Sequence, residues 1–184
     1  MKNILEQKGR EISYFLRHGQ KEFEQGLIDE HGWMTLDNLQ KITHTTQETI
    51  DEIVNSNDKK RYEYNEDKTK IRARQGHSIP VNVELKEATD ITPNNPYLYH
   101  GTSDRFIDNI KKQGLLPQSR LYVHLSKDQK TAQQVAIRHG GKNCIITINA
   151  YQMIQDGCKI YLSNNGVYNT KQVNTKYFVS INIL

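Results

Sequence analysis

The sequence has few of the features that mark secreted, membrane or disulfide-rich proteins. Its two cysteines, Cys144 and Cys158, are too few for a disulfide scaffold and form no Cys-x-x-Cys pair. No apolar run approaches the ~20 residues of a membrane span, and the polar start Met1-Lys2-Asn3 does not resemble a secretory signal. The sequence therefore predicts a soluble protein of the reducing cytoplasm.

Short motifs for metal and nucleotide binding are missing as well. The 7 histidines are scattered, with no His-x-x-x-His and no cysteine pair, so we expect no metal ion. No Gly-x-Gly-x-x-Gly follows a predicted strand, which argues against a dinucleotide on a Rossmann turn. Gly140-Gly141-Lys142 lacks the upstream glycine and the following Ser or Thr of a phosphate-binding loop.

Glutamate is absent from residues 96–184, which hold 11 Lys/Arg and 4 Asp for a net charge of +7. Residues 1–95 hold 14 Lys/Arg and 17 Asp/Glu, a net charge of −3. This asymmetry favours a polyanionic partner that binds mainly to the second half of the chain.

The first half begins with an amphipathic helix. Apolar residues at helical spacing predict it over residues 4–18, and Gly19 can end it. Arg17 and His18 then lie in the last turn, where the helix dipole favours cations whatever their function. A short extended segment and a turn are expected to deliver Trp33 to a core.

Two more helices and a hairpin follow. Apolar spacing predicts a short helix over residues 36–42, and Thr45-x-x-Glu48 is a capping box for the next helix. Alternating residues predict a hairpin within residues 61–74. Helices followed by a hairpin resemble a winged-helix module with Arg61–Arg74 as its wing, a topology that plain scaffolds share.

Pro93 and Pro96 mark residues 86–96 as a linker, and beyond it strands and helices alternate. The fold class predicted for the whole chain is therefore α+β. Strands are expected over residues 97–100, 122–125, 143–148, 159–162 and 177–183, and helices over residues 104–113, 128–138 and 151–155.

A candidate anion site follows from the end of the predicted hairpin. Arg72 and Arg74 are two residues apart, so on a strand both side chains leave the same face. Gly76 frees the backbone to turn, which would bring His77 and Ser78 close to the arginines. Guanidinium, imidazole and hydroxyl donors suit a phosphate, although a solvated basic strand would have the same sequence.

Polar residues at the ends of predicted elements form a series of six motifs. They are Leu16-Arg17-His18, Ile71-Arg72-Ala73 with Gln75-Gly76-His77-Ser78, Leu98-Tyr99-His100-Gly101-Thr102, Val123-His124-Leu125-Ser126, Thr131-Ala132 with Arg138-His139-Gly140, and Ser163-x-Asn165-Gly166-Val167. Each motif alone is more often a cap, a turn or a core histidine. Together, in this order and over nearly the whole chain, they resemble the RNA 2′-phosphotransferases, which use NAD⁺ to remove a splice-junction 2′-phosphate from tRNA.

This resemblance implies two lobes and a linker. Residues 1–85 would form a winged-helix-like lobe that binds the RNA 2′-phosphate, residues 86–96 the linker, and residues 97–184 an ADP-ribosyltransferase-like α/β lobe that binds NAD. The expected protein is a monomer whose partners are NAD, consumed as a co-substrate, and RNA bearing a 2′-phosphate, with no metal. The family reaction passes through RNA-2′-phospho-ADP-ribose and yields 2′-OH RNA, nicotinamide and ADP-ribose 1″,2″-cyclic phosphate.

The same resemblance implies roles for single residues. The catalytic tetrad around the transferred phosphate would be Arg17, His18, Arg72 and Arg138. The residues at or beside the NAD cleft would be His100, Gly101, Thr102, His124, Ser126 and Val167. Arg74 stands outside the implied tetrad.

The chain departs from the family pattern at Gln20, Ala136 and Tyr168-Asn169, positions that support the implied site. Two other functions remain open. An ADP-ribosyltransferase acting on nucleic-acid phosphate ends or on protein would share the NAD cleft, but protein-modifying members commonly use a glutamate that residues 96–184 lack. A winged-helix binding module would account for residues 1–85 only.

Overall fold

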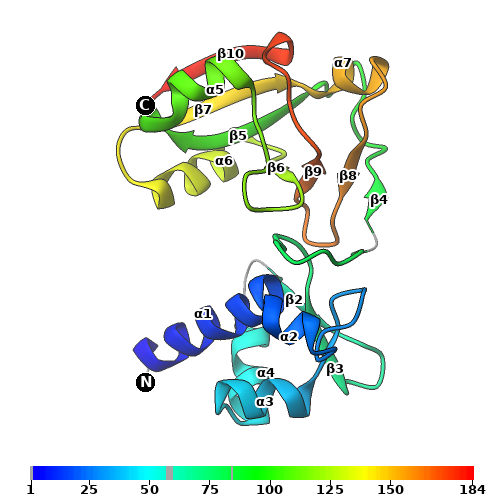
Figure 1. Ribbon diagram of the computed structural model, residues 1–184. Coiled ribbons are helices and arrows are strands. Elements are labelled where there is room, and N and C mark those ends of the chain that lie inside the picture. Colours follow the sequence, from blue (N-terminus) through cyan, green and yellow to red (C-terminus); the bar gives the residue numbers. More distant parts are fainter. Residues whose placement is uncertain (1, 57–59, 84) are drawn as a thin grey trace. The chain divides into compact units, whose positions relative to one another are not determined.

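The computed structural model describes residues 2–56, 60–83 and 85–184, and the chain divides into two compact units (Figure 1). The first unit is Met1–Glu84 with Ser119–Leu121, and the second is Leu85–Gln118 with Tyr122–Leu184. Each unit has its own hydrophobic core. Helices mixed with antiparallel sheets confirm the α+β class. Among the described residues, no helix is long and apolar enough to cross a membrane.

The first unit packs helices against a small antiparallel sheet with strand order β1-β3-β2. Ile12 and Leu16, one turn apart on the first helix, are fully buried with Leu39, Ile50 and Ile71. The elements are α1 (Lys2–His18), α2 (Gln20–Glu24), β1 (Met34–Thr35), α3 (Leu36–Thr43), α4 (Gln47–Asn55), β2 (Tyr62–Tyr64) and β3 (Lys70–Ala73).

The predicted helices and hairpin of this unit are confirmed, with one correction at a helix start. Helix α4 begins at Gln47, and its N-cap is Thr46, whose Oγ1 accepts a hydrogen bond from the backbone N–H of Thr49 at 3.4 Å. The hydroxyl of Thr45, the predicted cap, donates instead to the carbonyl of Thr43. Both Thr45 and Thr46 are of a residue type that caps helices. The left-handed residue His44 ends α3, and it determines which of the two threonines precedes the first turn of α4.

The second unit contains two antiparallel sheets whose apolar faces share one core. One sheet has the order β10-β7-β5 and the other β4-β8-β9-β6. The elements are β4 (Lys86–Glu87), β5 (Tyr97–Ser103), η1 (Asp104–Phe106), α5 (Ile107–Gln113), β6 (Val123–Leu125), α6 (Gln129–Ala136), η2 (Ile137–His139), β7 (Asn143–Asn149), α7 (Ala150–Gln155), β8 (Ile160–Leu162), β9 (Tyr168–Thr170), η3 (Thr175–Tyr177) and β10 (Phe178–Ile183).

The segment expected as a linker contributes to this second unit. Within residues 86–96, strand β4 pairs with β8, and Ile91 is buried in the core. Two residues of strand and one apolar side chain are too short a pattern to separate from a loop in the sequence.

Helix α6 lies directly against the backbone of β5 (Figure 1). A Cβ atom added at Gly101 would lie 1.8 Å from the carbonyl oxygen of Ala132. Gly101 is therefore required for the close approach of helix and strand, and the same approach fixes the β5 residues around it.

Candidate functional site

The first cluster of predicted site residues lies at the C-terminal end of α1. The carbonyl of Arg17 accepts hydrogen bonds from the backbone N–H groups of Ser78 at 2.9 Å and Ile79 at 3.4 Å. His18 Nδ1 lies 2.9 Å from the hydroxyl of Ser78. The segment after β3 thus satisfies the end of the helix, and it holds the predicted Arg17-His18 and His77-Ser78 motifs together.

Arg17 gives the clearest indication of an anion-binding site. Its Nε and Nη2 atoms are buried and have no hydrogen-bond partner among the described residues. The pKa of Arg17 is lowered to about 10, first by burial and then by the charges of Arg61 and Arg120, while Tyr62 acts in the opposite direction. A buried guanidinium without acceptors is costly, and a bound anion would supply those acceptors.

Arg72 is held in place by the protein. Its Nε donates to Glu63 Oε1 at 2.7 Å and its Nη1 to the carbonyl of His31 at 3.3 Å. The guanidinium also lies 4.3 Å from the ring centre of Trp33. Trp33 was expected in a core, but it is half-buried and supports Arg72 through a cation–π contact instead.

Arg72 and Arg74 do leave the same side of their strand, because both contact one carboxylate. Glu63 lies opposite Arg72 in the hairpin, and its Oε2 is 3.3 Å from Nε of Arg74. Arg74 also donates to the carbonyl of Tyr62. The contribution of Glu63 was missed, although counting back from the hairpin turn places it across from Arg72.

His77 is a neutral group among these cations. It is 3% exposed, and its Nε2 has no hydrogen-bond partner among the described residues. Burial lowers the pKa of His77 to about 3, and the charges of Arg17, His18 and Arg72 act in the same direction. His77 therefore stays uncharged near neutral pH and adds no further positive charge to the cluster.

His18 responds to the same surroundings but remains half-buried. Its pKa is lowered from the usual value, first by burial and then by the charges of Arg17 and Arg120. Near neutral pH its imidazole is therefore mainly neutral, unless a bound anion restores the proton.

The second cluster lies where the two sheets of the second unit meet. Tyr99 on β5 and Ser126 after β6 exchange two backbone hydrogen bonds, of 2.9 and 2.7 Å. Beside this bridge, His100 Nδ1 lies 3.0 Å from the carbonyl oxygen of His124. The structure thus brings together three of the residues predicted for the NAD cleft: His100, His124 and Ser126.

Val167 belongs to the same end of these strands. Strand β6 pairs with β9 so that Leu125 faces Tyr168, and continuing this register places Val167 opposite Ser126. The turn before β9 is tied by Ser163, whose hydroxyl donates to the Val167 carbonyl at 2.8 Å. The amide of Asn169, which is fully buried, donates to the same carbonyl at 2.8 Å.

Gly101 and Thr102 are buried members of β5, paired with Ile145 and Cys144. Both residues are packed inside the unit, so neither presents an exposed side chain. The N–H and C=O of Gly101 point to the same edge of the strand as those of Tyr99, because these groups alternate along a strand. Gly101 can therefore serve a ligand through its backbone.

Arg138 lies in the short turn η2, which follows α6 and contacts β5. Its side chain is exposed. The turn ends at Gly140 with φ of 66°, and the carbonyl of His139 accepts a hydrogen bond from Arg105. The turn is thus held at its C-terminal end, and Arg138 is an exposed residue of it.

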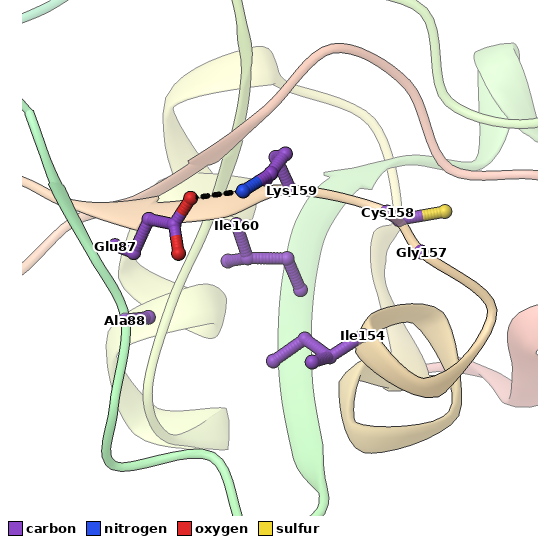
Figure 2. A pocket seen from close by; sticks show the side chains of 7 residues that line it. All are labelled: Glu87, Ala88, Ile154, Gly157, Cys158, Lys159 and Ile160. Atoms are coloured by element: carbon purple, nitrogen blue, oxygen red, sulfur yellow. Dashed lines mark hydrogen bonds and ion pairs between the residues drawn. The ribbon is translucent and has the colours of Figure 1, made fainter.

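A surface hollow in the second unit contains none of the predicted site residues (Figure 2). Glu87 and Lys159, which form an ion pair, line it together with apolar side chains such as Ile154 and Ile160. No group of three or more His, Cys, Asp or Glu side chains within residues 2–56, 60–83 and 85–184 is arranged to hold a metal ion.

Comparison with known proteins defines the family. The family model described as "RNA 2′-phosphotransferase, Tpt1 / KptA family" matches residues 4–172. A "Probable RNA 2′-phosphotransferase" of Fusobacterium nucleatum is 46% identical over 174 residues, covering 92% of this chain and 94% of the relative. One of Flavobacterium johnsoniae is 44% identical over 181 residues, covering 95% and 96%. A relative of the same name from Escherichia coli is 40% identical over 171 residues, covering 90% of each.

These similarities extend over both units and include both clusters of site residues. The class of the protein is therefore that of a transferase enzyme. The chain belongs to the RNA 2′-phosphotransferase, Tpt1 / KptA family.

Proposed function

We propose that this protein removes an internal 2′-phosphate from a tRNA-like RNA, with NAD⁺ consumed as co-substrate. The products are 2′-OH RNA, nicotinamide and ADP-ribose 1″,2″-cyclic phosphate, and the reaction passes through RNA-2′-phospho-ADP-ribose. The observation that carries the proposal is the buried guanidinium of Arg17 beside His18, two nitrogens of which find no acceptor within residues 2–56, 60–83 and 85–184. Family membership supplies the kind of anion.

The same proposal assigns one role to each half of the chain, with the domain limits that the motifs imply. Residues 1–85 act as a winged-helix-like RNA-binding lobe and residues 97–184 as an ADP-ribosyltransferase-like NAD-binding lobe, joined through residues 86–96. Helices α3 and α4 followed by the β2–β3 hairpin support the first assignment, and two antiparallel sheets around one core support the second. The enzyme works as a cytoplasmic monomer without a metal.

The residues of the first cluster fit a phosphate dianion. Arg17 offers two donors that have no partner in the described part of the chain, and His18 lies beside it with its ring position set by Ser78. Arg72 presents a guanidinium whose orientation is fixed by Glu63 and Trp33. Charge-assisted hydrogen bonds from such preorganised donors are about twice as strong as neutral ones.

The residues of the second cluster fit the nicotinamide end of a dinucleotide. A carboxamide needs one donor and one acceptor, and the edge of β5 at Gly101 presents both from its backbone. His100 and His124 add polar rings beside the small Ser126, and Val167 adds an apolar contact. In this proposal Thr102 contributes by packing within β5, because it is only 4% exposed.

When bound, NAD⁺ supplies an electrophilic ribose carbon with nicotinamide as its leaving group. The protein then needs no general base for the first step, because a phosphate dianion is already a nucleophile and only has to be positioned correctly. Arg17 and Arg72 hold the phosphate oxygens and stabilise the charge that gathers on them when phosphorus is attacked in the second step. His18 donates a hydrogen bond or a proton at the same oxygens, and the family motif assigns Arg138 to this phosphate as well.

The experiment that tests this function is incubation of the protein with NAD⁺ and an oligonucleotide carrying one labelled internal 2′-phosphate. We expect label in ADP-ribose cyclic phosphate, release of nicotinamide, and no turnover with Arg17→Gln. Lys41→Gln on α3, an exposed charge change in the same unit, should be as active as the wild type. Transfer of ADP-ribose to a terminal phosphate or to protein, with the internal 2′-phosphate untouched, would contradict the proposal.

A further inference from the structure

The three residues Ser119–Leu121 group with the first unit, although the residues on either side of them belong to the second. The backbone N–H of Leu121 donates to the carbonyl of His77 at 3.0 Å, and the Leu121 side chain packs against the core of the first unit. His77 precedes Ser78, which is bonded to Arg17 and His18. The segment is therefore anchored one residue from the phosphate-binding motif.

Arg120 is the charged residue of this segment. The hydrogen bond of the next residue, Leu121, to His77 places the Arg120 backbone beside the segment that contacts Arg17 and His18. In agreement with this placement, the charge of Arg120 lowers the pKa of Arg17 and also that of His18. No carboxylate in the described part of the chain is among the groups that shift the pKa of either residue. Glu63, a carboxylate of the same unit, is bonded to Arg72 and Arg74.

The positive charges of Arg17 and Arg120 repel each other, which destabilises the folded protein unless an anion offsets them. Two buried nitrogens of Arg17 have no acceptor among the residues that the structure describes, which indicates the side on which such an anion binds. Neither the tetrad motif nor the cleft motifs include Arg120, and sequence reasoning missed it because it lies far from Arg17 along the chain.

We propose that Arg120 is a further substrate-binding residue, whose guanidinium donates to an oxygen of the phosphate held by Arg17 and His18. This inference rests on the proposed function, since it takes that phosphate to be the RNA 2′-phosphate. Arg120 then discriminates RNA with a 2′-phosphate from RNA without one. The anchoring of Leu121 positions it, because the backbone next to Arg120 is fixed against His77.

The test is equilibrium binding without NAD⁺, measured by fluorescence anisotropy. Two oligonucleotides of one sequence are compared, one with and one without an internal 2′-phosphate. Loss of a charge-assisted hydrogen bond should weaken binding of the phosphorylated oligonucleotide to Arg120→Gln by about tenfold or more, with little change for the other. Lys41→Gln, which removes one exposed charge from the same unit, should leave the ratio of the two affinities unchanged.

Arg120→Lys keeps the charge and loses the planar fork, so it should retain part of the discrimination. It also serves if the Gln variant folds poorly. An NMR titration gives a second readout: the pKa of His18 should rise in Arg120→Gln, because a neighbouring positive charge is gone. An unchanged His18 titration, or equal weakening of both oligonucleotides, would overturn the assignment of Arg120.

The result for the wild-type protein separates the two hypotheses. A wild type without preference for the 2′-phosphate would refute the proposed function itself. A wild type with a clear preference that Arg120→Gln and Arg120→Lys both keep in full would refute only the role of Arg120.

Discussion

Replacing Glu63 by glutamine should distinguish two properties of the phosphate site, its net positive charge and the orientation of Arg72. Glu63 joins Arg72 at 2.7 Å and Arg74 at 3.3 Å, and its side chain is only 14% exposed. Glutamine keeps the shape and one acceptor oxygen but removes the negative charge and with it both ion pairs. The variant therefore has a more positive site in which Arg72 is less firmly oriented.

The size of the effect on stability follows from the burial of these groups. The Arg72 and Arg74 side chains are 11% and 21% exposed, so neither is fully hydrated. A hydrogen bond to a charged group contributes about 1.5–3 kcal/mol, and the substituted glutamine would retain a part of one such bond. We expect the free energy of unfolding to fall by about 2 kcal/mol, with Arg72 still supported by Trp33 and the carbonyl of His31.

Binding and turnover should change in opposite directions. The added net positive charge should leave the affinity for RNA unchanged or raise it at low salt. Turnover should fall by about tenfold to a hundredfold, because a donor that is misplaced by a fraction of an ångström stabilises the transition state less well. Denaturant unfolding, anisotropy and single-turnover assays measure the three quantities. Glu66→Gln, an exposed change in the same hairpin, is the matched control.

The positioning role would be refuted if Glu63→Gln lost RNA affinity and turnover in equal proportion. That result would mean that Glu63 supports the fold alone and not the orientation of Arg72. Equal behaviour of the Glu63 and Glu66 variants would refute it as well.

Three other predictions concern single residues. Gly101→Ala should lower the free energy of unfolding by about 3 kcal/mol or more, measured by denaturant titration, because its Cβ would meet the carbonyl of Ala132. His77 has a pKa of about 3 when folded and the ordinary value of 6.5 when unfolded, so the unfolded state binds the proton more readily. Stability should therefore fall by up to about 1.4 kcal/mol per pH unit as pH drops from 6.5 towards 3, and less steeply in His77→Gln. Arg138→Lys should still release nicotinamide but accumulate ADP-ribosylated RNA on single-turnover gels, because the phosphoryl-transfer step depends most on the guanidinium fork. Equal slowing of both steps would contradict this division.

Local patterns in the sequence predicted the helices and the hairpin, because the hydrophobic period of each such element is visible within one contiguous segment. The amphipathic face of α1 and the alternation in β2 and β3 each need only one element to be seen. The short strands β4 and β9 could not be seen in this way. All of Tyr168–Thr170 is buried, including the polar Asn169 and Thr170, and only pairing with β6 and β8 explains that burial.

Sequence reasoning about the site was limited in the same manner. It placed Ser78 close to Arg72 and Arg74, whereas the structure shows Ser78 in contact with Arg17 and His18. It could not show that Trp33 supports Arg72, since a half-buried tryptophan and a core tryptophan look alike in sequence. Such contacts depend on the packing of separate elements, which no short pattern encodes.

The two arginines of the first cluster are satisfied in different ways, and this difference predicts opposite effects on stability. Arg72 has Glu63, the carbonyl of His31 and the ring of Trp33 as partners, so Arg72→Met should leave Glu63 and that carbonyl less well satisfied. We expect it to lower the free energy of unfolding by about 2 kcal/mol. Arg17 has two buried nitrogens without a partner among the described residues. Arg17→Met therefore removes the desolvation cost of these nitrogens from the folded state.

Arg17→Met should therefore leave the free energy of unfolding unchanged or raise it by about 1 kcal/mol, while abolishing turnover. Denaturant unfolding of both variants, with and without a saturating 2′-phosphorylated oligonucleotide, measures the contrast. The ligand should stabilise the wild type far more than Arg17→Met, because binding to the folded state alone shifts the equilibrium by mass action. If Arg17→Met proved as destabilising as Arg72→Met, the guanidinium of Arg17 would have partners in the folded protein. Arg17 would then be a structural residue and not a phosphate-binding one.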